Sequence, residues 1–314
     1  MAVGHYVDEA TGVQQTLAER WADGSWAVEP TPSPGDEGIE QLTSVSCLSP
    51  TDCTAAGVYS TPAASETTLI EHWDGTTWTV VTSPNPAGTT TAELDAVSCA
   101  STTSCTATGL YNAGAGRQAR ELPLAEHWDG TSWTIQHVPL PAGVTSANLS
   151  SGVSCPTPTR CIAVSLGLLT EQWNGTRWAA LTTPAPAQAF NPGFRGVSCS
   201  SAKSCTAVGG YLNSSNVDEP LVERWNGTSW TIQTDATPAN TTLGAVSCTS
   251  GTSCTAVGSD VIGAVAEQWD GSSWTLEPMP ARHAGFLSGA SCRSASICTA
   301  VGSYGEGHPL AEHE

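Results

Sequence analysis

The chain has 314 residues, a formal net charge of −19 and only 12% charged residues, yet it contains 12 cysteines and 12 tryptophans. The acidic balance argues against a nucleic-acid partner, because phosphate backbones are bound by clustered Lys and Arg, of which the chain has 10 in all. No stretch reaches the roughly 18–20 consecutive apolar residues of a membrane-spanning helix, so we expect no membrane insertion.

The first residues lie inside a repeat. Ala2-Val3-Gly4-His5-Tyr6 matches the second strand of the later units, and Trp21 and Trp26 flank a closing hairpin, so residues 1–32 are predicted to form a partial blade. Met1-Ala2-Val3-Gly4 has neither the basic nor the apolar segment of a signal peptide. We therefore expect a mature form or a fragment of a longer chain.

Five complete repeats follow, and each has a Cys-x5-Cys pair and then a Trp-x4-Trp pair. Their first cysteines are 44 to 56 residues apart, which fits the period of roughly 40–50 residues of a four-stranded β-propeller blade. A linear β-solenoid is the alternative, although it does not require tight hairpins that alternate with long crossovers. The full blades are predicted at about 41–86, 93–141, 149–185, 193–235 and 242–280.

Each complete repeat is predicted to contain four strands, of which the first has the smallest side chains and is therefore the innermost. Asp-Gly or Asn-Gly separates the third strand from the fourth, as at Asp74-Gly75, and predicts a two-residue type I′ turn. With that turn, Trp73 pairs with Thr76 and Glu71 lies opposite Trp78. The disulfide loops and these turns then share one face, and the strand two–three loops and crossovers share the other.

The last residues, 287–314, form a second partial blade. The chain is thus a single all-β domain over 1–314, and the expected closure is a six-bladed propeller in which Cys292–Tyr304 pairs with Leu17–Trp26. Seven blades with two incomplete ones are the alternative. A closed propeller is favoured because it removes exposed sheet edges.

The cysteines are predicted to form one local disulfide in each blade, which places the protein in an oxidising, extracellular compartment. We expect no metal site and no cofactor, because no His accompanies the pairs and Cys-x5-Cys is not a usual zinc spacing. The predicted bonds join Cys47 to Cys53, Cys99 to Cys105, Cys155 to Cys161, Cys199 to Cys205, Cys248 to Cys254 and Cys292 to Cys298.

Every tyrosine of the chain lies where the second strand meets the strand two–three loop, whose length varies most between repeats. Tyrosine has a flat ring with a polar tip, which suits contacts with sugars or proteins. We predict that this face binds the ligand, while packing between blades is the alternative role of the rings. The candidate binding residues are Tyr6, Tyr59, Tyr111, Tyr211 and Tyr304.

A Glu two residues before the first Trp recurs in the complete repeats, as at Glu126 and Trp128. It predicts either a repeated sugar pocket or, since every repeat has it, packing within the wedge between blades. No catalytic constellation is apparent, and no catalytic residue is assigned. Glu93 and Asp95 are the acidic residues from which a site at the axis would be built.

The repeat unit resembles a family of secreted actinobacterial propeller proteins that carry tandem Val-Ser-Cys, Cys-Thr-Ala-Val-Gly and Trp-Asp-Gly-Thr-Ser-Trp segments, as in Val246–Trp274. The hairpin Glu126–Trp133 is also similar to that of six-bladed fucose-binding propeller lectins, and its Asp-Gly-Thr turn is similar to the Asp-box of sialidase-type propellers. These resemblances imply a propeller fold and an extracellular setting.

The function hypothesis is a secreted, monomeric, non-catalytic propeller that binds carbohydrate in the manner of a lectin. A protein-interaction or adhesion scaffold that uses the same loops is the alternative. A glycan-processing enzyme of the sialidase-like propeller type is a further alternative.

Overall fold

The computed structural model describes residues 1–35, 38–62, 64–114, 119–278, 285–304 and 308–313. These residues form strands and connecting loops without a helix, and they contain no helix that is long and apolar enough to cross a membrane. The chain divides into two compact units, of which unit 1 comprises residues 1–159 and 173–179 and unit 2 comprises 160–172 and 180–314.

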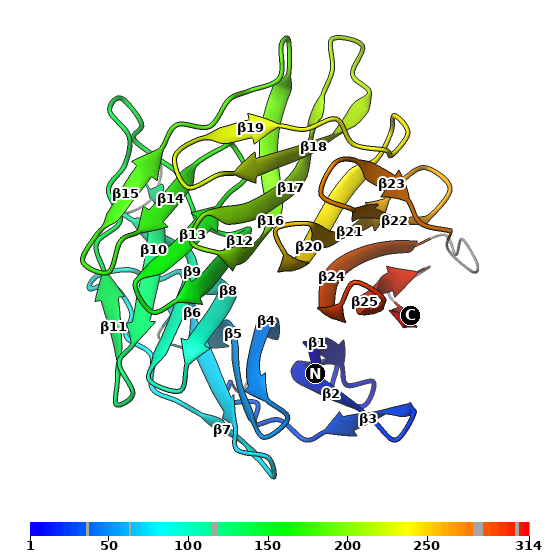
Figure 1. Ribbon diagram of the computed structural model, residues 1–314. Coiled ribbons are helices and arrows are strands. Elements are labelled where there is room, and N and C mark those ends of the chain that lie inside the picture. The colour runs from blue at the N-terminus through cyan, green and yellow to red at the C-terminus, as the bar shows by residue number, and fades with distance from the viewer. Residues whose placement is uncertain (36–37, 63, 115–118, 279–284, 305–307, 314) are drawn as a thin grey trace. The chain divides into compact units, whose positions relative to one another are not determined.

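Unit 1 contains three complete sheets, and in each of them strands that are adjacent in the chain are hydrogen-bonded neighbours (Figure 1). The first sheet consists of β1 (Ala2–Val7), β2 (Gln14–Ala22) and β3 (Ser25–Glu29). The second consists of β4 (Glu40–Ser49), β5 (Asp52–Thr61), β6 (Ala64–Trp73) and β7 (Trp78–Val80). The third consists of β8 (Ala92–Ser101), β9 (Ser104–Ala113), β10 (Arg120–Trp128) and β11 (Trp133–Gln136).

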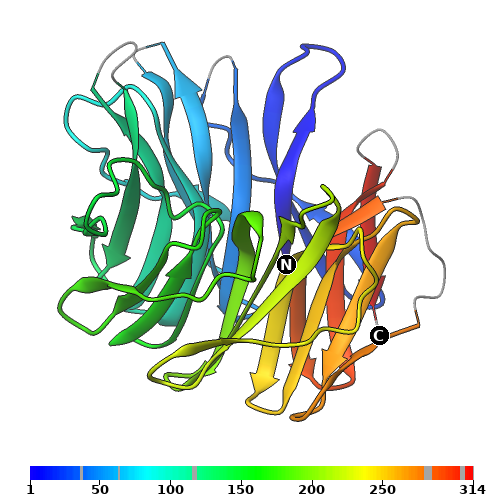
Figure 2. The same cartoon turned by 90° about the horizontal axis from the view of Figure 1, so that it is seen from above.

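Unit 2 also contains three complete sheets, whose strands lie side by side in chain order (Figure 1 and Figure 2). The first has β16 (Phe190–Ser201), β17 (Ser204–Leu212), β18 (Asp218–Trp225) and β19 (Trp230–Ile232). The second has β20 (Thr242–Ser250), β21 (Ser253–Ser259), β22 (Ala264–Trp269) and β23 (Trp274–Leu276), and the third has β24 (Gly285–Ser294), β25 (Ile297–Tyr304) and β26 (His308–His313). A further four-stranded sheet consists of β12 (Gly152–Thr157), β13 (Arg160–Val164), β14 (Thr170–Trp173) and β15 (Trp178–Leu181).

The described residues therefore form a β-propeller of seven blades, five with four strands and two with three. The six-bladed closure is wrong, because residues 14–19 pair with Ala2–Val7 of β1, and Cys292–Tyr304 pairs within the sheet β24–β26. Each end of the chain thus completes a hairpin with its own neighbouring strand. Such a local hairpin closes a short loop, which costs less chain entropy than pairing the two ends of the chain.

The turn between the third and fourth strands also differs from the predicted type I′ turn. Trp73 faces Trp78 and Glu71 faces Val80, so the loop has four residues and the predicted Trp73–Thr76 and Glu71–Trp78 pairs are wrong. The Asp74 carboxylate explains the longer loop, because its Oδ1 accepts hydrogen bonds from the backbone N–H groups of the residues two and three positions on, at 2.8 and 2.9 Å. A two-residue turn with positive φ at both positions occurs only in the first blade among the described hairpins of this type, at Asp23 and Gly24.

The turns pack against the disulfide loops of their own blades, as the sequence predicts for two features on one face. Gly75 has a φ of +98°, and a Cβ at this position would lie 2.8 Å from the side chain of Thr51 in the Cys47–Cys53 loop. Both the conformation and the close approach require glycine. Trp73 strengthens the contact by donating its indole N–H to the Pro50 carbonyl at 3.2 Å.

The predicted disulfides are confirmed, since no cysteine is free and all twelve are disulfide-bonded. In five blades the two bonded cysteines also face each other across the first and second strands, so the bond links these strands beside their connecting loop. These five bonds join Cys47 to Cys53, Cys99 to Cys105, Cys199 to Cys205, Cys248 to Cys254 and Cys292 to Cys298. The two cysteines that complete the set of twelve, Cys155 on β12 and Cys161 on β13, are disulfide-bonded as well.

The cysteines also contribute to the packing of the blades. The second cysteine of a pair is buried in the five complete blades, with exposed fractions of 4% or less. Their positions on the second strand place them in the blade interior, where they add apolar packing to the covalent link. These buried residues are Cys53, Cys105, Cys161, Cys205 and Cys254, whereas Cys298 of the last blade is only partly buried.

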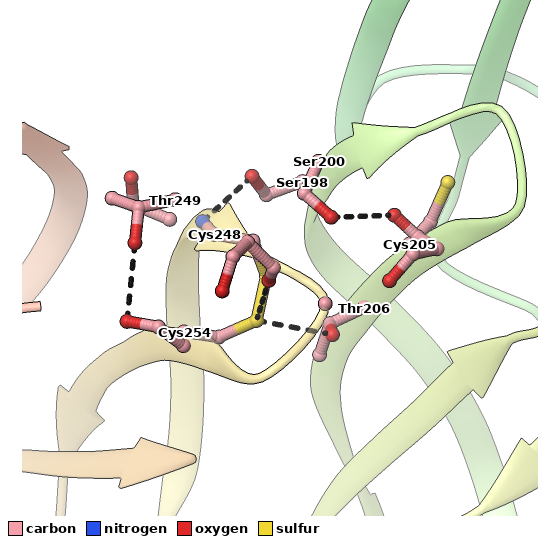
Figure 3. The surroundings of a disulfide bond; sticks show 12 residues. Ser198, Ser200, Cys205, Thr206, Cys248, Thr249 and Cys254 are labelled. Atoms are coloured by element: carbon pink, nitrogen blue, oxygen red, sulfur yellow. Dashed lines mark hydrogen bonds between the residues drawn. A yellow bond between two sulfur atoms is a disulfide. The ribbon is translucent and has the colours of Figure 1, made fainter. Parts of the chain in front are cut away.

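A serine just before the first cysteine joins a blade to the next one at four places in the described residues. The Ser198 hydroxyl accepts a hydrogen bond from the backbone N–H of Cys248 at 2.9 Å, which connects β16 with β20 (Figure 3). Equivalent bonds run from Cys99 to Ser46, from Cys155 to Ser98 and from Cys292 to Ser247. The first strands of successive blades therefore lie side by side within each unit, which agrees with their predicted inner position.

Candidate functional site

A cleft of about 520 Å³ lies in unit 1 between the blade β4–β7 and the blade β8–β11. It opens beside the disulfide loops and the Asp-Gly turn, so it lies at the opposite end of the strands from the strand two–three loops. The side chains that give it chemical character come from four short segments of the two blades. They are Leu48, Asp52, His72, Asp74, Thr102 and Trp128.

His72 and Asp52 are within hydrogen-bond distance in this cleft, with His72 Nε2 3.1 Å from Asp52 Oδ1. Both side chains keep contact with solvent, at 41% and 27% exposure. The alternation of β6 places His72 on the sheet face opposite to that of the fully buried Glu71. Asp52 is the first residue of β5, so this contact joins two neighbouring strands of one blade.

Trp128 of β10 supplies the opposite wall, and its ring is half-buried. The indole N–H donates to the Thr102 carbonyl at 3.2 Å, and the ring packs against Trp133 with centroids 6.0 Å apart. These contacts fix the orientation of the ring. A fixed aromatic surface with nearby polar groups is the usual composition of a site for a small polar ligand.

The electrostatic character of the cleft is negative. Hydrogen bonds from the Thr76 side chain and from the backbone of Thr77 and Thr76 lower the pKa of Asp74 to about 2, so its carboxylate is ionised at neutral pH. The described residues that line the cleft include neither Lys nor Arg. The cleft is therefore better suited to a neutral or cationic ligand than to an anion.

The five predicted tyrosines lie on five different sheets, and the structure does not bring them into one pocket. Tyr59, Tyr111 and Tyr211 each pack against the apolar core of a different blade. Tyr6 and Tyr304 are 49% and 41% exposed on β1 and β25. A role of these tyrosines in ligand binding stays a prediction.

The recurring glutamates lie in the interior of the blades. Their side chains have no exposed surface, which excludes them from direct contact with a ligand in the folded protein. Glu126 accepts a hydrogen bond from Ser83 at 2.7 Å, and Glu267 accepts one from the backbone N–H of Ala236 at 2.9 Å, and both donors lie in the preceding crossover. The members of the set are Glu71, Glu126, Glu171, Glu223 and Glu267.

The two acidic residues considered for a site at the axis lie on β8. Burial and then the charge of Glu93 raise the pKa of Asp95 to about 8. Burial, followed by the charges of Glu66 and Glu121, also raises the pKa of Glu93. Burial is the largest cause of the pKa shift at both residues.

The cleft was not predicted from the sequence, because its residues belong to different repeats. One signal was present in the aligned repeats. The residue before the second cysteine is an aspartate only at Asp52, while the other repeats have Ser104, Arg160, Ser204, Ser253 and Ile297 at this position. A departure from a repeat at a loop position indicates a role that the common fold does not require.

No protein-family model matches the chain, and no curated protein matches it. Solved propeller structures do match. The structure titled YCF48 bound to D1 peptide has a TM-score of 0.54 and 15% identity, over 87% of this chain and 78% of that one. A GH74 xyloglucanase from Xanthomonas campestris gives 0.57 and 13%, over 87% of this chain and 43% of the enzyme.

A fungal lectin from Aleuria aurantia, whose title describes a six-bladed β-propeller and fucose recognition, has a TM-score of 0.50 and 13% identity over 86% of this chain and 89% of the lectin. At these identities the similarity shows the fold alone. The matched proteins include a peptide complex, a glycan-degrading enzyme and a lectin, so the fold is compatible with several kinds of ligand.

Proposed function

We propose that this protein is a secreted, non-catalytic propeller that binds carbohydrate in the cleft between the blades β4–β7 and β8–β11. The observation that carries the proposal is the fixed ring of Trp128 opposite the His72–Asp52 pair. An aromatic ring can pack against the apolar face of a sugar, while the imidazole and carboxylate can hydrogen-bond its hydroxyl groups. The six disulfides support an extracellular setting, since such bonds persist in oxidising compartments.

The test is a glycan array of the oxidised full chain, with and without calcium, followed by titration of any glycan that binds. Replacing His72 by Ala is expected to weaken binding about tenfold, which corresponds to the loss of about one hydrogen bond. His5→Ala is the matched control, because His5 is exposed on β1 outside the cleft. Equal effects of the two changes would exclude the cleft as the binding site.

A blank array on the folded protein would overturn the carbohydrate proposal and favour the second candidate, a protein-interaction scaffold. One observation favours that candidate. Val261 and Ile262 form the tip of the turn between β21 and β22 and are 81% and 60% exposed. A partner protein that packs against this tip would remove these aliphatic side chains from water.

A further inference from the structure

A groove between two blades of unit 2 can be compared with the cleft, because equivalent residues of the repeat line both. In unit 2, Arg224 of β18 reaches the blade β20–β23 and lies over the ring of Trp269, with 4.6 Å between its Cζ and the ring centroid. It donates to the Gly251 carbonyl at 2.6 Å and to Thr206 Oγ1 at 3.3 Å. A cation is therefore stacked on tryptophan in this groove and supplied by the chain itself.

The two grooves correspond residue by residue in the repeat. Arg224 and His72 both precede the first Trp of their hairpins, and Trp269 and Trp128 are the first Trp of the following blade. Likewise, Gly251 and Thr102 both stand three residues after the first cysteine of their loops. The carbonyl that accepts from Arg224 in one groove is thus the equivalent of the Thr102 carbonyl beside the cleft.

The neighbouring groove is bridged in the same way. Gln268 of β22 donates its side-chain amide to the Ala295 carbonyl at 2.6 Å, and Ala295 also stands three residues after a first cysteine. His72 is shorter than Arg224 and is held by Asp52 within its own blade. The cleft therefore lacks the bridging side chain that both described grooves of unit 2 contain, and Trp128 stays accessible.

The cleft also carries the charge that a cation would require. Asp52 and Asp74 add two carboxylates, and the Asp52 position is neutral in the groove that Arg224 occupies, where it is Ser204. In the groove of unit 2 the protein supplies a cation, Arg224, over the tryptophan ring. In the cleft it supplies carboxylates and no Arg or Lys among the lining residues. This exchange is the expected pattern if the cleft receives its cation from a ligand.

We propose that the cleft binds the ammonium group of an amino sugar, a saccharide with a free 2-amino group, over the face of Trp128 in the position that the Arg224 guanidinium takes over Trp269. This inference rests on the proposed function, because it takes the cation as part of a saccharide. A cation on a partly solvated aromatic ring and a nearby carboxylate favour an ammonium over an uncharged amide substituent.

The experiment is a titration of the oxidised full chain at about pH 6 with a glucosamine oligomer and with its N-acetylated counterpart of the same length. The glucosamine oligomer is expected to bind about tenfold more tightly, and the difference is expected to shrink as salt is added. Asp52→Asn should remove most of the difference. Asp218→Asn is the matched control, because it removes the same charge at an exposed position outside the cleft.

The outcomes separate the two proposals. Equal affinity for both oligomers, or a difference that Asp52→Asn leaves intact, overturns the amino-sugar inference and leaves the carbohydrate-binding function standing. Tighter binding of the N-acetylated oligomer also overturns it. Failure of every saccharide on the array overturns both, and thermal unfolding of each variant shows that the loss does not come from misfolding.

Discussion

The aspartate of the Trp-Asp-Gly hairpin acts through a single oxygen atom. Asp129 Oδ1 accepts hydrogen bonds from the backbone N–H groups of Thr131 and Ser132 at 2.8 and 2.9 Å and from the Thr131 hydroxyl at 2.7 Å. These bonds, led by that of the hydroxyl, lower the pKa of Asp129 to about 2. Asn174 makes the same three contacts through its amide oxygen, so the turn also forms with a neutral acceptor.

Asp129 and Asn174 occupy the same turn position in two blades, so substitutions of Asp129 separate the role of the acceptor from that of the charge. Asp129→Asn is expected to lower the melting temperature only slightly at pH 7, because the amide oxygen retains the acceptor and only the charge is lost. Asp129→Ala is expected to lower it by a few degrees, because two turn N–H groups lose their partner. Thermal unfolding followed by circular dichroism measures both. An equal loss in the two variants would show that the carboxylate charge stabilises the turn.

At the scale of the element, the Val-Ser-Cys segment has two functions in one strand. The cysteine bonds the first strand to the second strand of its own blade, as Cys199 bonds to Cys205, and the preceding serine accepts a hydrogen bond from the next blade. A single three-residue segment therefore sets both the hairpin and the contact between blades. The recurrence of this segment in the sequence follows from that double role.

Ser198→Ala tests the contact between blades. The change leaves the N–H of Cys248 without its partner in a partly buried position and is expected to destabilise the protein by about 1 kcal/mol. Chemical denaturation measures the loss. Ser214→Ala serves as the control, because Ser214 is exposed in the loop between β17 and β18, and a loss of the same size in the control would refute the inter-blade role of Ser198.

The sequence predicts those elements of the fold that depend on local spacing. The disulfide hairpins and the four-stranded repeat follow from the Cys and Trp intervals, and the structure confirms them. The expected number of blades, six, was wrong, because Ala2–Val7 can be assigned to a blade only when its partner, residues 14–19, is known. The turn register was wrong because the Asp74 side chain supplies hydrogen bonds that a backbone turn type does not include.

The candidate site is less predictable than the fold for a physical reason. Whether a groove is open depends on whether a side chain before the first Trp spans to the next blade, as Arg224 does and His72 does not. The length and pairing of one side chain decide this, and the repeat pattern contains no information about its conformation. Alignment of the repeats identifies Asp52 as unusual, but its contact with His72 requires coordinates.

At the scale of the whole molecule, the buried glutamates give every complete blade an ionisable group in its interior. Burial is the largest cause of the shift in each case, and it raises the pKa of Glu71, Glu126, Glu171 and Glu223 to about 8 and that of Glu267 to about 7. In the unfolded chain the same groups ionise near pH 4.5. The five carboxyl groups are therefore protonated in the folded protein over a range in which the unfolded chain has released its protons.

This difference sets the sign of the pH dependence. Because the folded state binds more protons between about pH 4.5 and 8, the free energy of unfolding is highest near the lower limit and falls as pH rises through the folded-state pKa values. The turn aspartates Asp74, Asp129 and Asp270 act in the opposite sense at lower pH, since their stabilising hydrogen bonds are lost as pH falls toward about 2. Stability should therefore be greatest at about pH 4 to 5.

Glu223→Gln tests this explanation, because glutamine has nearly the same shape and cannot ionise. Neither carboxyl oxygen of Glu223 has a hydrogen-bond partner among the described residues, so the substitution removes the cost of a buried charge and breaks no bond. At pH 8 we expect the variant to be more stable than the parent by on the order of 1–2 kcal/mol, and at pH 4.5 we expect the two to be nearly equal. Denaturant unfolding at both pH values measures the difference, with Glu9→Gln, an exposed residue between β1 and β2, as the control. A gain in stability that is the same at both pH values would mean that packing, rather than ionisation, limits the stability of the blade interior.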